Sequence, residues 1–219
     1  MSETETTQQL RDRCRLVLVA NSTLFSPDGE NAVAGFGACM KAGDIASVIF
    51  DHGGLEENAF QAAIQPLVGI AQANGVASVV CDKSRVARHV GADGLQLGQD
   101  PDALEDAIAR FQPAMMVGAG NVKTRHNALV LGEMQPDYLM FGKPGGDTRP
   151  EPNPKNIDLG AWWSSMIEIP CIVLGGTSAD SALTVAQTGA EFVALGEAVF
   201  ALHNGDIDFD AAAEAIAHA

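Results

Sequence analysis

Gly91-Ala92-Asp93-Gly94-Leu95 and Gly189-Ala190-Glu191-Phe192-Val193 are two copies of one local pattern. In each copy a glycine suits the C-terminal cap of a helix, an acidic residue follows, and an apolar strand begins. Pro136-Asp137-Tyr138-Leu139 is a weaker copy of the same pattern. A helix that runs directly into a strand, more than once along a chain, is typical of folds in which strands and helices alternate.

Short apolar runs flank these copies in both directions along the chain. Each run is continuously apolar, and this predicts strands that are covered on both faces, as in parallel sheets. We predict eight such strands: Arg15–Ala20, Ile45–Phe50, Ala77–Asp82, Gly94–Leu97, Met115–Gly118, Tyr138–Phe141, Cys171–Leu174 and Phe192–Leu195.

Helical patterns occupy much of the chain between the predicted strands. Pro101–Phe111 begins with proline followed by acidic residues, a typical helix start. The other predicted helices are Asn58–Ala73, Thr124–Glu133, Asn156–Ile167, Ala179–Thr188 and Phe209–His218. Eight strands in regular alternation with helices predict a (β/α)8 TIM barrel, and an open doubly wound sheet is the alternative.

The length of 219 residues suits one such barrel. Hydrophobic residues make up 47% of the chain and charged residues 19%, which excludes a chain that is disordered throughout. We expect residues 13–219 to form a single barrel domain. The polar residues 1–12 are expected to form a disordered N-terminal tail.

The chain carries a formal net charge of −15, so it has no general attraction for DNA, RNA or anionic membranes. No apolar run reaches the ~18 residues that span a bilayer. The four cysteines lack CxxC spacing, which favours buried free thiols in a reducing cytoplasm over a zinc site. We expect a cytoplasmic protein that binds a small molecule, with a homodimer as an open alternative to a monomer.

Glycine turns follow the predicted seventh and eighth strands. They are Leu174-Gly175-Gly176-Thr177 and Leu195-Gly196-Glu197-Ala198. Glycines let the backbone approach an anion and direct amides at it, and many barrels bind phosphate between these two loops. Plain tight turns are the alternative. The predicted phosphate site consists of Gly175, Gly176, Thr177, Gly196 and Glu197.

Carboxylates follow the predicted third and fourth strands. Asp82 ends the third strand, where a carboxylate can hold Mg²⁺ or orient a substrate amine. Asp100 and Asp102 follow the fourth strand and could complete the same metal site. Helix capping is the alternative for Asp82 and for the Asp100/Asp102 pair.

Polar residues also follow the second and fifth strands. Gly120 leaves room above the barrel, and Asn121 could reach a ligand there, as could Lys123 unless it is only a helix-surface charge. His52 follows the second strand and is a candidate acid–base group, with a surface turn as the alternative.

The one long irregular stretch is Gly142–Lys155, which follows the sixth strand and contains four prolines. A long loop on that face of a barrel is a candidate lid. Lys143 and Arg149 bring positive charge to it, which suits a pyrophosphate or carboxylate partner. A merely solvated loop is the alternative. Gly142, Lys143 and Arg149 are therefore further candidate site residues, and Lys143 is a candidate catalytic group.

These motifs together resemble the thiamine phosphate synthase family, which also includes the thiazole tautomerases. The resemblance rests on Asp82, Gly91–Gln99, Pro136–Gly142, Leu174-Gly175-Gly176 and Gly189–Leu195, in order and at similar spacing. It implies a barrel that joins a pyrimidine pyrophosphate to a thiazole phosphate with Mg²⁺, giving thiamine phosphate and pyrophosphate. It also implies that Asp82 and the Asp100/Asp102 pair bind metal, and that Gly176 and the Gly196–Ala198 turn bind the thiazole phosphate.

The departures from the family pattern lie at the pyrophosphate end of the site. Phe50–Glu57 has no Lys or Arg where the family has a Gln-x-Arg-x-x-x-Lys stretch. Cys81 stands in place of an Asn, Pro101 in place of the second metal Asp, and Gly120-Asn121-Val122 in place of Ser-x-His. Lys143–Arg149 replaces a Pro-Thr-x-Thr-Lys loop.

The sequence thus predicts a thiamine phosphate synthase-like enzyme with atypical pyrophosphate-binding residues. One alternative is a thiazole tautomerase-type isomerase with His52 as its base. The other is a non-catalytic barrel that binds a phosphorylated ligand. A mouth plugged by Gly142–Lys155, with no anion site at Gly176, would argue against all three.

Overall fold

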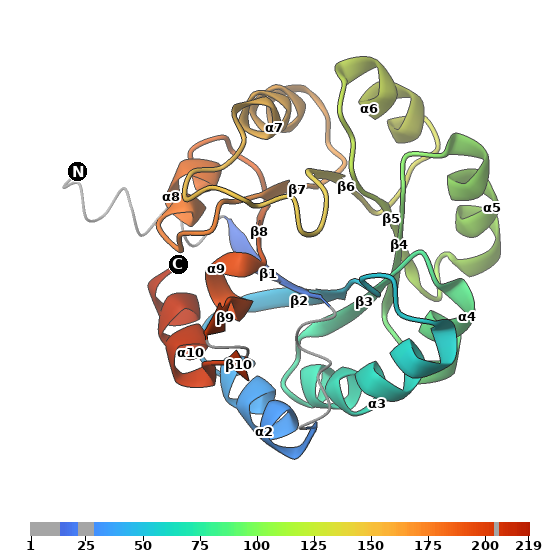
Figure 1. Cartoon of the computed structure of the whole chain (residues 1–219). Coiled ribbons are helices and arrows are strands. Elements are labelled where there is room, and N and C mark those ends of the chain that lie inside the picture. The colour runs from blue at the N-terminus through green and yellow to red at the C-terminus, as the bar shows by residue number, and fades with distance from the viewer. Residues whose placement is uncertain (1–13, 22–28, 204–205) are drawn as a thin grey trace.

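The strands of the computed structural model close into one parallel barrel in sequence order (Figure 1). The structure describes residues 14–21, 29–203 and 206–219, so the predicted tail of residues 1–12 lies outside the described residues. The (β/α)8 fold is confirmed, and the open-sheet alternative is wrong. The strands are β1 Arg15–Ala20, β2 Ile45–Phe50, β3 Ala77–Cys81, β4 Gly94–Leu97, β5 Met116–Ala119, β6 Tyr138–Phe141, β7 Cys171–Leu174 and β8 Phe192–Leu195.

Helices surround the barrel and follow the strands in turn (Figure 1). Two short strands, β9 (Leu202–His203) and β10 (Asp206–Ile207), pair outside the barrel. The helices are α2 Gly29–Cys39, α3 Glu57–Ala73, α4 Ser84–Val90, α5 Pro101–Phe111, α6 Arg125–Gly132, α7 Pro154–Met166, α8 Ser181–Ala186, α9 Glu197–Phe200 and α10 Phe209–His218.

Helix α2 was not predicted from the sequence. Its sequence includes Gly35 and Gly37, and glycine has low helix propensity. Packing explains at least one of them, because a Cβ at Gly35 would lie 2.2 Å from the ring of Phe209 in α10. The close approach of α2 to α10 therefore favours glycine at a position where local propensity disfavours it.

The repeated pattern of Gly91–Leu95, Pro136–Leu139 and Gly189–Val193 has a structural role. Gly91 caps α4 with a left-handed backbone (φ 69°), as the pattern predicts. The acidic side chain of each copy accepts a hydrogen bond from an amide at the start of the preceding strand, which pins two neighbouring strands together. The pairs are Asp93 with Ser78, Asp137 with Val117, and Glu191 with Cys171, at 2.8, 2.7 and 2.9 Å.

The inside of the barrel is apolar apart from a small buried polar cluster. The Tyr138 hydroxyl donates to Gln96 Oε1 at 3.1 Å, and Gln96 Nε2 donates to Cys81 Sγ at 3.7 Å. Gly118 makes room for the tyrosine, because a Cβ there would lie 2.2 Å from the ring. This cluster lies just below the strand ends that form the mouth.

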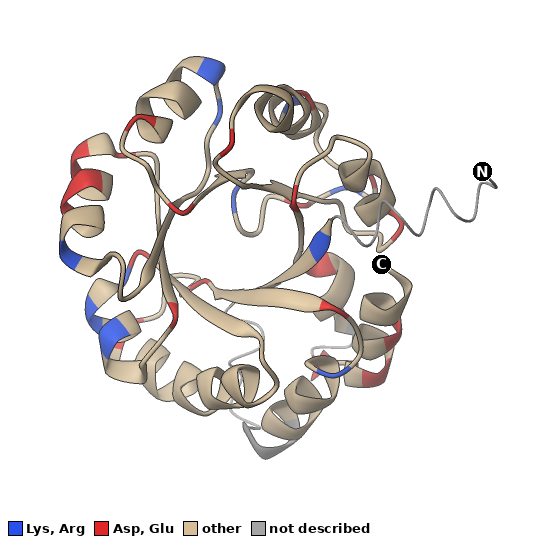
Figure 2. Ribbon diagram, turned by 180° about the vertical axis from the view of Figure 1, so that it is seen from behind, with Lys and Arg blue, Asp and Glu red and all other residues tan. Residues whose placement is uncertain are grey.

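The charge and the cysteines agree with the sequence reading. The acidic residues are spread around the ring of helices and loops (Figure 2). All four cysteines are buried and free, as predicted. In the part of the chain that the structure describes, no helix is both long and apolar enough to cross a membrane.

Candidate active site at the mouth of the barrel

The loop between β6 and α7 packs onto the ends of β7 and β8 (Figure 1). The Thr177 amide donates to the Arg149 carbonyl oxygen at 2.7 Å, and the Ser178 amide donates to the Pro150 carbonyl oxygen at 3.4 Å. A Cβ at Gly176 would lie 2.0 Å from that same Pro150 oxygen. Gly176 is therefore needed for the close approach of the loop backbone.

Through its side chain, Asp147 connects the loop to the second glycine turn, the one that follows β8. Its side chain is 4% exposed, and its Oδ2 atom accepts a hydrogen bond from the Glu197 amide at 2.7 Å. A Cβ at Gly196 would lie 3.0 Å from Oδ2. Burial raises the pKa of the Asp147 carboxyl, although hydrogen bonds from backbone amides partly lower it. The Oδ1 atom is buried without a hydrogen-bond partner among the described residues.

The predicted phosphate site stays a prediction, and the structure shows which groups its amides contact. Both glycine turns lie at the ends of β7 and β8, as expected. However, the Thr177, Ser178 and Glu197 amides bind the chain's own loop where an anion was predicted. The remaining amide of the first turn, that of Gly176, donates to Ser181 Oγ at 2.9 Å. The glycines thus provide room for protein atoms in this structure.

Two polar residues at the mouth have strained backbones. Asp82 follows β3 and Asn121 lies beyond the end of β5, and both have φ 58°, a region that non-glycine residues rarely adopt outside functional or turn positions. The capping alternative for Asp82 is wrong, because Lys83 is the N-cap residue of α4 and no side chain caps that helix. Packing favours glycine at position 120, because a Cβ there would lie 2.8 Å from Gln96 Nε2.

Of the second pair of predicted metal ligands, Asp100 and Asp102, the structure shows a capping role for Asp100. Asp100 caps α5, and its side chain accepts hydrogen bonds from the amides of Asp102 and Ala103 at 3.1 and 3.5 Å. Among residues 14–21, 29–203 and 206–219 no group of three His, Cys, Asp or Glu side chains could hold a metal ion. Mg²⁺ often takes only one or two carboxylates and completes its coordination with waters and substrate phosphates. Asp82 fits that smaller requirement.

The predicted base His52 is part of a turn. Its Nδ1 atom accepts a hydrogen bond from the Gly54 amide at 3.0 Å. Its ring also packs edge-on against Phe60, with centroids 6.1 Å apart. An imidazole that accepts at Nδ1 carries its proton on Nε2, so His52 is not poised as a base in this state. The contacts of His52 are those of the surface turn that was the alternative for this residue.

Basic side chains gather on the other side of the loop. A cavity of ≈ 270 Å³ is lined by Lys123, Lys143 and Lys155, together with Asn121, and none of its lining residues is acidic. None of the three lysines forms an ion pair with a described residue. The sequence did not predict that Lys123 and Lys155 would line one cavity, because they come from separate segments of the chain.

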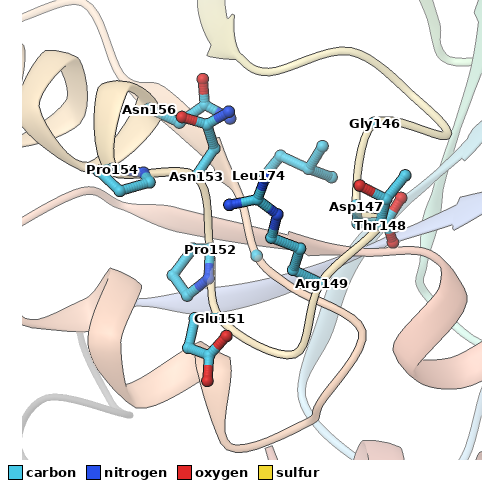
Figure 3. A pocket seen from close by; sticks show the side chains of 11 residues that line it. Gly146, Asp147, Thr148, Arg149, Glu151, Pro152, Asn153, Pro154, Asn156 and Leu174 are labelled. Carbon is cyan, nitrogen blue, oxygen red and sulfur yellow. The ribbon is translucent and has the colours of Figure 1, made fainter.

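A second cavity, of ≈ 350 Å³, lies beside the first and shares Gly146, Asn153, Asn156 and Leu174 with it. Arg149, Asp147 and Glu151 line it, and Figure 3 shows the Arg149 side chain among these residues. The two cavities place both predicted loop cations, Lys143 and Arg149, at the mouth. They also show that the Gly142–Lys155 loop does not plug the mouth, so the condition that would argue against all three functions is not met.

Residues 16–199 match the family described as thiamine monophosphate synthase. The chain belongs to this family. It is 30% identical to thiamine-phosphate synthase of Rhodospirillum centenum over 83% of the chain and 87% of that protein. It is also 30% identical to that of Hyphomonas neptunium over 91% of each. The structure of thiamine phosphate pyrophosphorylase from Pyrococcus furiosus superposes with a TM-score of 0.74 at 21% identity, covering 95% of each chain.

Membership of the thiamine monophosphate synthase family makes this chain a transferase-family enzyme of thiamine biosynthesis. The resemblance stated from the sequence is thereby confirmed. The mouth of this chain holds a buried aspartate, Asp147, against the glycine turn after β8, and a lysine-lined cavity beside it.

Proposed function

We propose that this barrel joins a pyrimidine pyrophosphate to a thiazole acceptor and holds the departing pyrophosphate at the lysine-lined cavity. The observation that carries the proposal is the cavity of Lys123, Lys143 and Lys155, which has no acidic lining residue in a chain of net charge −15. A leaving group with about three negative charges needs such compensation. The four buried free cysteines support a reducing, cytoplasmic setting.

The reaction requires charge stabilisation more than proton transfer. The bond between the pyrimidine methylene carbon and the pyrophosphate oxygen breaks, and its electron pair leaves with pyrophosphate. The lone pair of the thiazole nitrogen then forms the new carbon–nitrogen bond, and no proton moves. Lysines can neutralise the leaving oxygens, while Asn121 at the same cavity can orient the donor. A general base is not needed, in agreement with the turn role of His52.

Mg²⁺, when bound, would neutralise further charge on the pyrophosphate. Asp82 is the residue that we assign to it, because it directly follows β3 at the mouth, is exposed, and is not used as a helix cap. The tautomerase alternative receives no support, since it depends on His52 as a base.

Replacing the cavity lysines should impair use of the pyrophosphate donor. We expect Lys143→Ala and Lys155→Ala each to lower kcat/KM for the pyrimidine pyrophosphate about tenfold, a loss of ~1.4 kcal/mol of transition-state stabilisation. Product is measured by mass spectrometry with purified full-length chain and Mg²⁺. Lys41→Ala is the matched control, because it removes the same charge from an exposed site between α2 and β2. Equal kinetics in all three variants would reject the cavity as the pyrophosphate site.

Substitutions at Asp82 and Asp100 should distinguish a metal-binding role from a helix-capping role. Asp82→Asn, which removes the charge and keeps a residue type that tolerates the left-handed backbone, is expected to reduce turnover about tenfold or more while leaving the free energy of unfolding nearly unchanged. Asp100→Ala should instead lower that free energy by about 1 kcal/mol, because α5 loses its cap, with turnover retained. Chemical denaturation and turnover at several Mg²⁺ concentrations test both. Loss of turnover in Asp100→Ala alone would reverse the assignment.

A further inference from the structure

We propose that Asp147 is a specificity-determining residue whose carboxylate occupies the place of an acceptor phosphate, so that this barrel takes a thiazole acceptor bearing a free hydroxyl at that end. This inference rests on the transferase function proposed above and specifies the acceptor. In an anion site, the amides at the ends of β7 and β8 would point at the ligand.

Protein atoms satisfy those amides. The Thr177 and Ser178 amides donate to carbonyl oxygens of the loop, and the Glu197 amide donates to Asp147 Oδ2. The loop segment that provides the carbonyls, residues 149–154, contains three prolines, whose fixed φ limits the conformations it can adopt. Pro152 within it is buried. A phosphate at this place would have to displace three hydrogen bonds and a proline-rich segment.

The charge of Asp147 opposes a second anion. Its side chain is 4% exposed, and it forms no ion pair with any residue in the described ranges. Two like charges about 4 Å apart at a partly buried site repel strongly enough to weaken binding on the order of a hundredfold. Glu197 in the same turn adds negative charge, whereas the charge of the exposed Glu151 is screened by solvent. The site is therefore suited to an uncharged group.

The unpartnered oxygen of Asp147 indicates which uncharged group that is. Oδ1 is a buried acceptor with no donor among the described residues, and an unsatisfied buried acceptor is costly. A hydroxyl group can donate a hydrogen bond to it, whereas an ionised phosphate can only accept. Asp147 also lines the ≈ 350 Å³ cavity at the mouth, as Figure 3 shows. An alcohol entering from this cavity would satisfy Oδ1 after a small movement of the loop.

A competition experiment tests the inference. Purified full-length chain is supplied with pyrimidine pyrophosphate, Mg²⁺, and equal amounts of the thiazole alcohol and the thiazole phosphate. We expect thiamine to form about tenfold or more in excess over thiamine phosphate. Asp147→Asn removes the charge and keeps an acceptor for the Glu197 amide, so it should raise the phosphate-to-alcohol ratio of kcat/KM at least about tenfold. Asp147→Ala should shift the ratio in the same direction.

Glu151→Gln is the matched control, because it removes one charge from the same loop at an exposed position lining the same cavity. The ratio in this variant should equal that of the unmodified chain. Preference of the unmodified chain for the thiazole phosphate, or an unchanged ratio in both Asp147 variants, would overturn the inference while leaving the transferase proposal intact.

If neither thiamine nor thiamine phosphate forms, the transferase proposal is overturned. The role of Asp147 is then tested separately by measuring binding. Calorimetric titration with thiazole phosphate should show at least about tenfold tighter binding to Asp147→Asn than to the unmodified chain or to Glu151→Gln. Equal affinities would reject Asp147 as the group that excludes phosphate. Thermal unfolding of each variant identifies any loss of structure.

Discussion

Gly176→Val should lower the free energy of unfolding by about 3 kcal/mol and release the loop between β6 and α7. A Cβ at this position would lie 2.0 Å from the Pro150 carbonyl oxygen and 2.6 Å from that of Arg149. Both atoms belong to the backbone, so no side-chain rotation can relieve the overlap. The loop must move, and the hydrogen bonds from Thr177 and Ser178 are lost with it.

Chemical denaturation measures the stability loss, and hydrogen exchange measures the release of the loop. The Thr177 and Ser178 amides should exchange faster in Gly176→Val than in the unmodified chain. Gly98→Val is the control, because Gly98 also follows a barrel strand but a Cβ there would have no described atom within 4 Å. Native stability and slow exchange in Gly176→Val would contradict the loop contact.

Gly118→Ala should destabilise the barrel from within, by about 3 kcal/mol. A single added carbon would lie 2.2 Å from the Tyr138 ring, which fills the barrel interior. The ring would have to leave its position, and its hydroxyl would lose the hydrogen bond to Gln96. An unsatisfied Gln96 side chain, 3% exposed, adds to the cost.

Tyr138 is the only tyrosine of the chain, so it also reports on the change. Burial raises the pKa of its hydroxyl well above the ordinary value. The stability that Tyr138 contributes is therefore present below a pH of about 10 and is lost as the pH rises further. In Gly118→Ala the tyrosine should ionise at a lower pH, which the absorbance of tyrosinate measures.

Gly69→Ala is the control for this prediction and should have the opposite sign. Gly69 is exposed within α3, and nothing lies within 4 Å of a Cβ there. Replacing it should stabilise the protein by about 0.5–1 kcal/mol, because glycine is unfavourable in a helix. Two glycine-to-alanine changes with opposite effects would show that packing, not the residue type, determines the outcome. An undiminished stability of Gly118→Ala would place the tyrosine ring elsewhere.

The barrel could be predicted from the sequence because its strands are marked by composition alone. Continuous apolar runs located all eight strands. The prediction for β5 was displaced by one residue, and the prediction for β3 extended one residue too far, to Asp82. Helix α2 was missed because Gly35 is explained by a distant partner, Phe209, which no local pattern shows. Local rules succeed where neighbouring residues determine the structure and fail where a remote contact does.

The site could be predicted only in part, for a related reason. Glycines at the ends of β7 and β8 correctly indicated that something approaches the backbone closely. Sequence cannot say whether the approaching group is a ligand or the chain itself, and here it is Asp147 and the Pro150 carbonyl. Asp147 had no signal beyond an acidic residue within a Gly- and Pro-rich loop. The three lysines come together only in the folded chain.

The acids of the repeated pattern pin β3 to β4, β5 to β6, and β7 to β8 at the ends of the strands remote from the mouth. Three of the strand pairs are in this sense locked by a carboxylate at the foot. None of these three contacts involves the loops at the opposite rim. Those loops are consequently free to change their residues, and with them the molecules they admit, while the architecture beneath them persists.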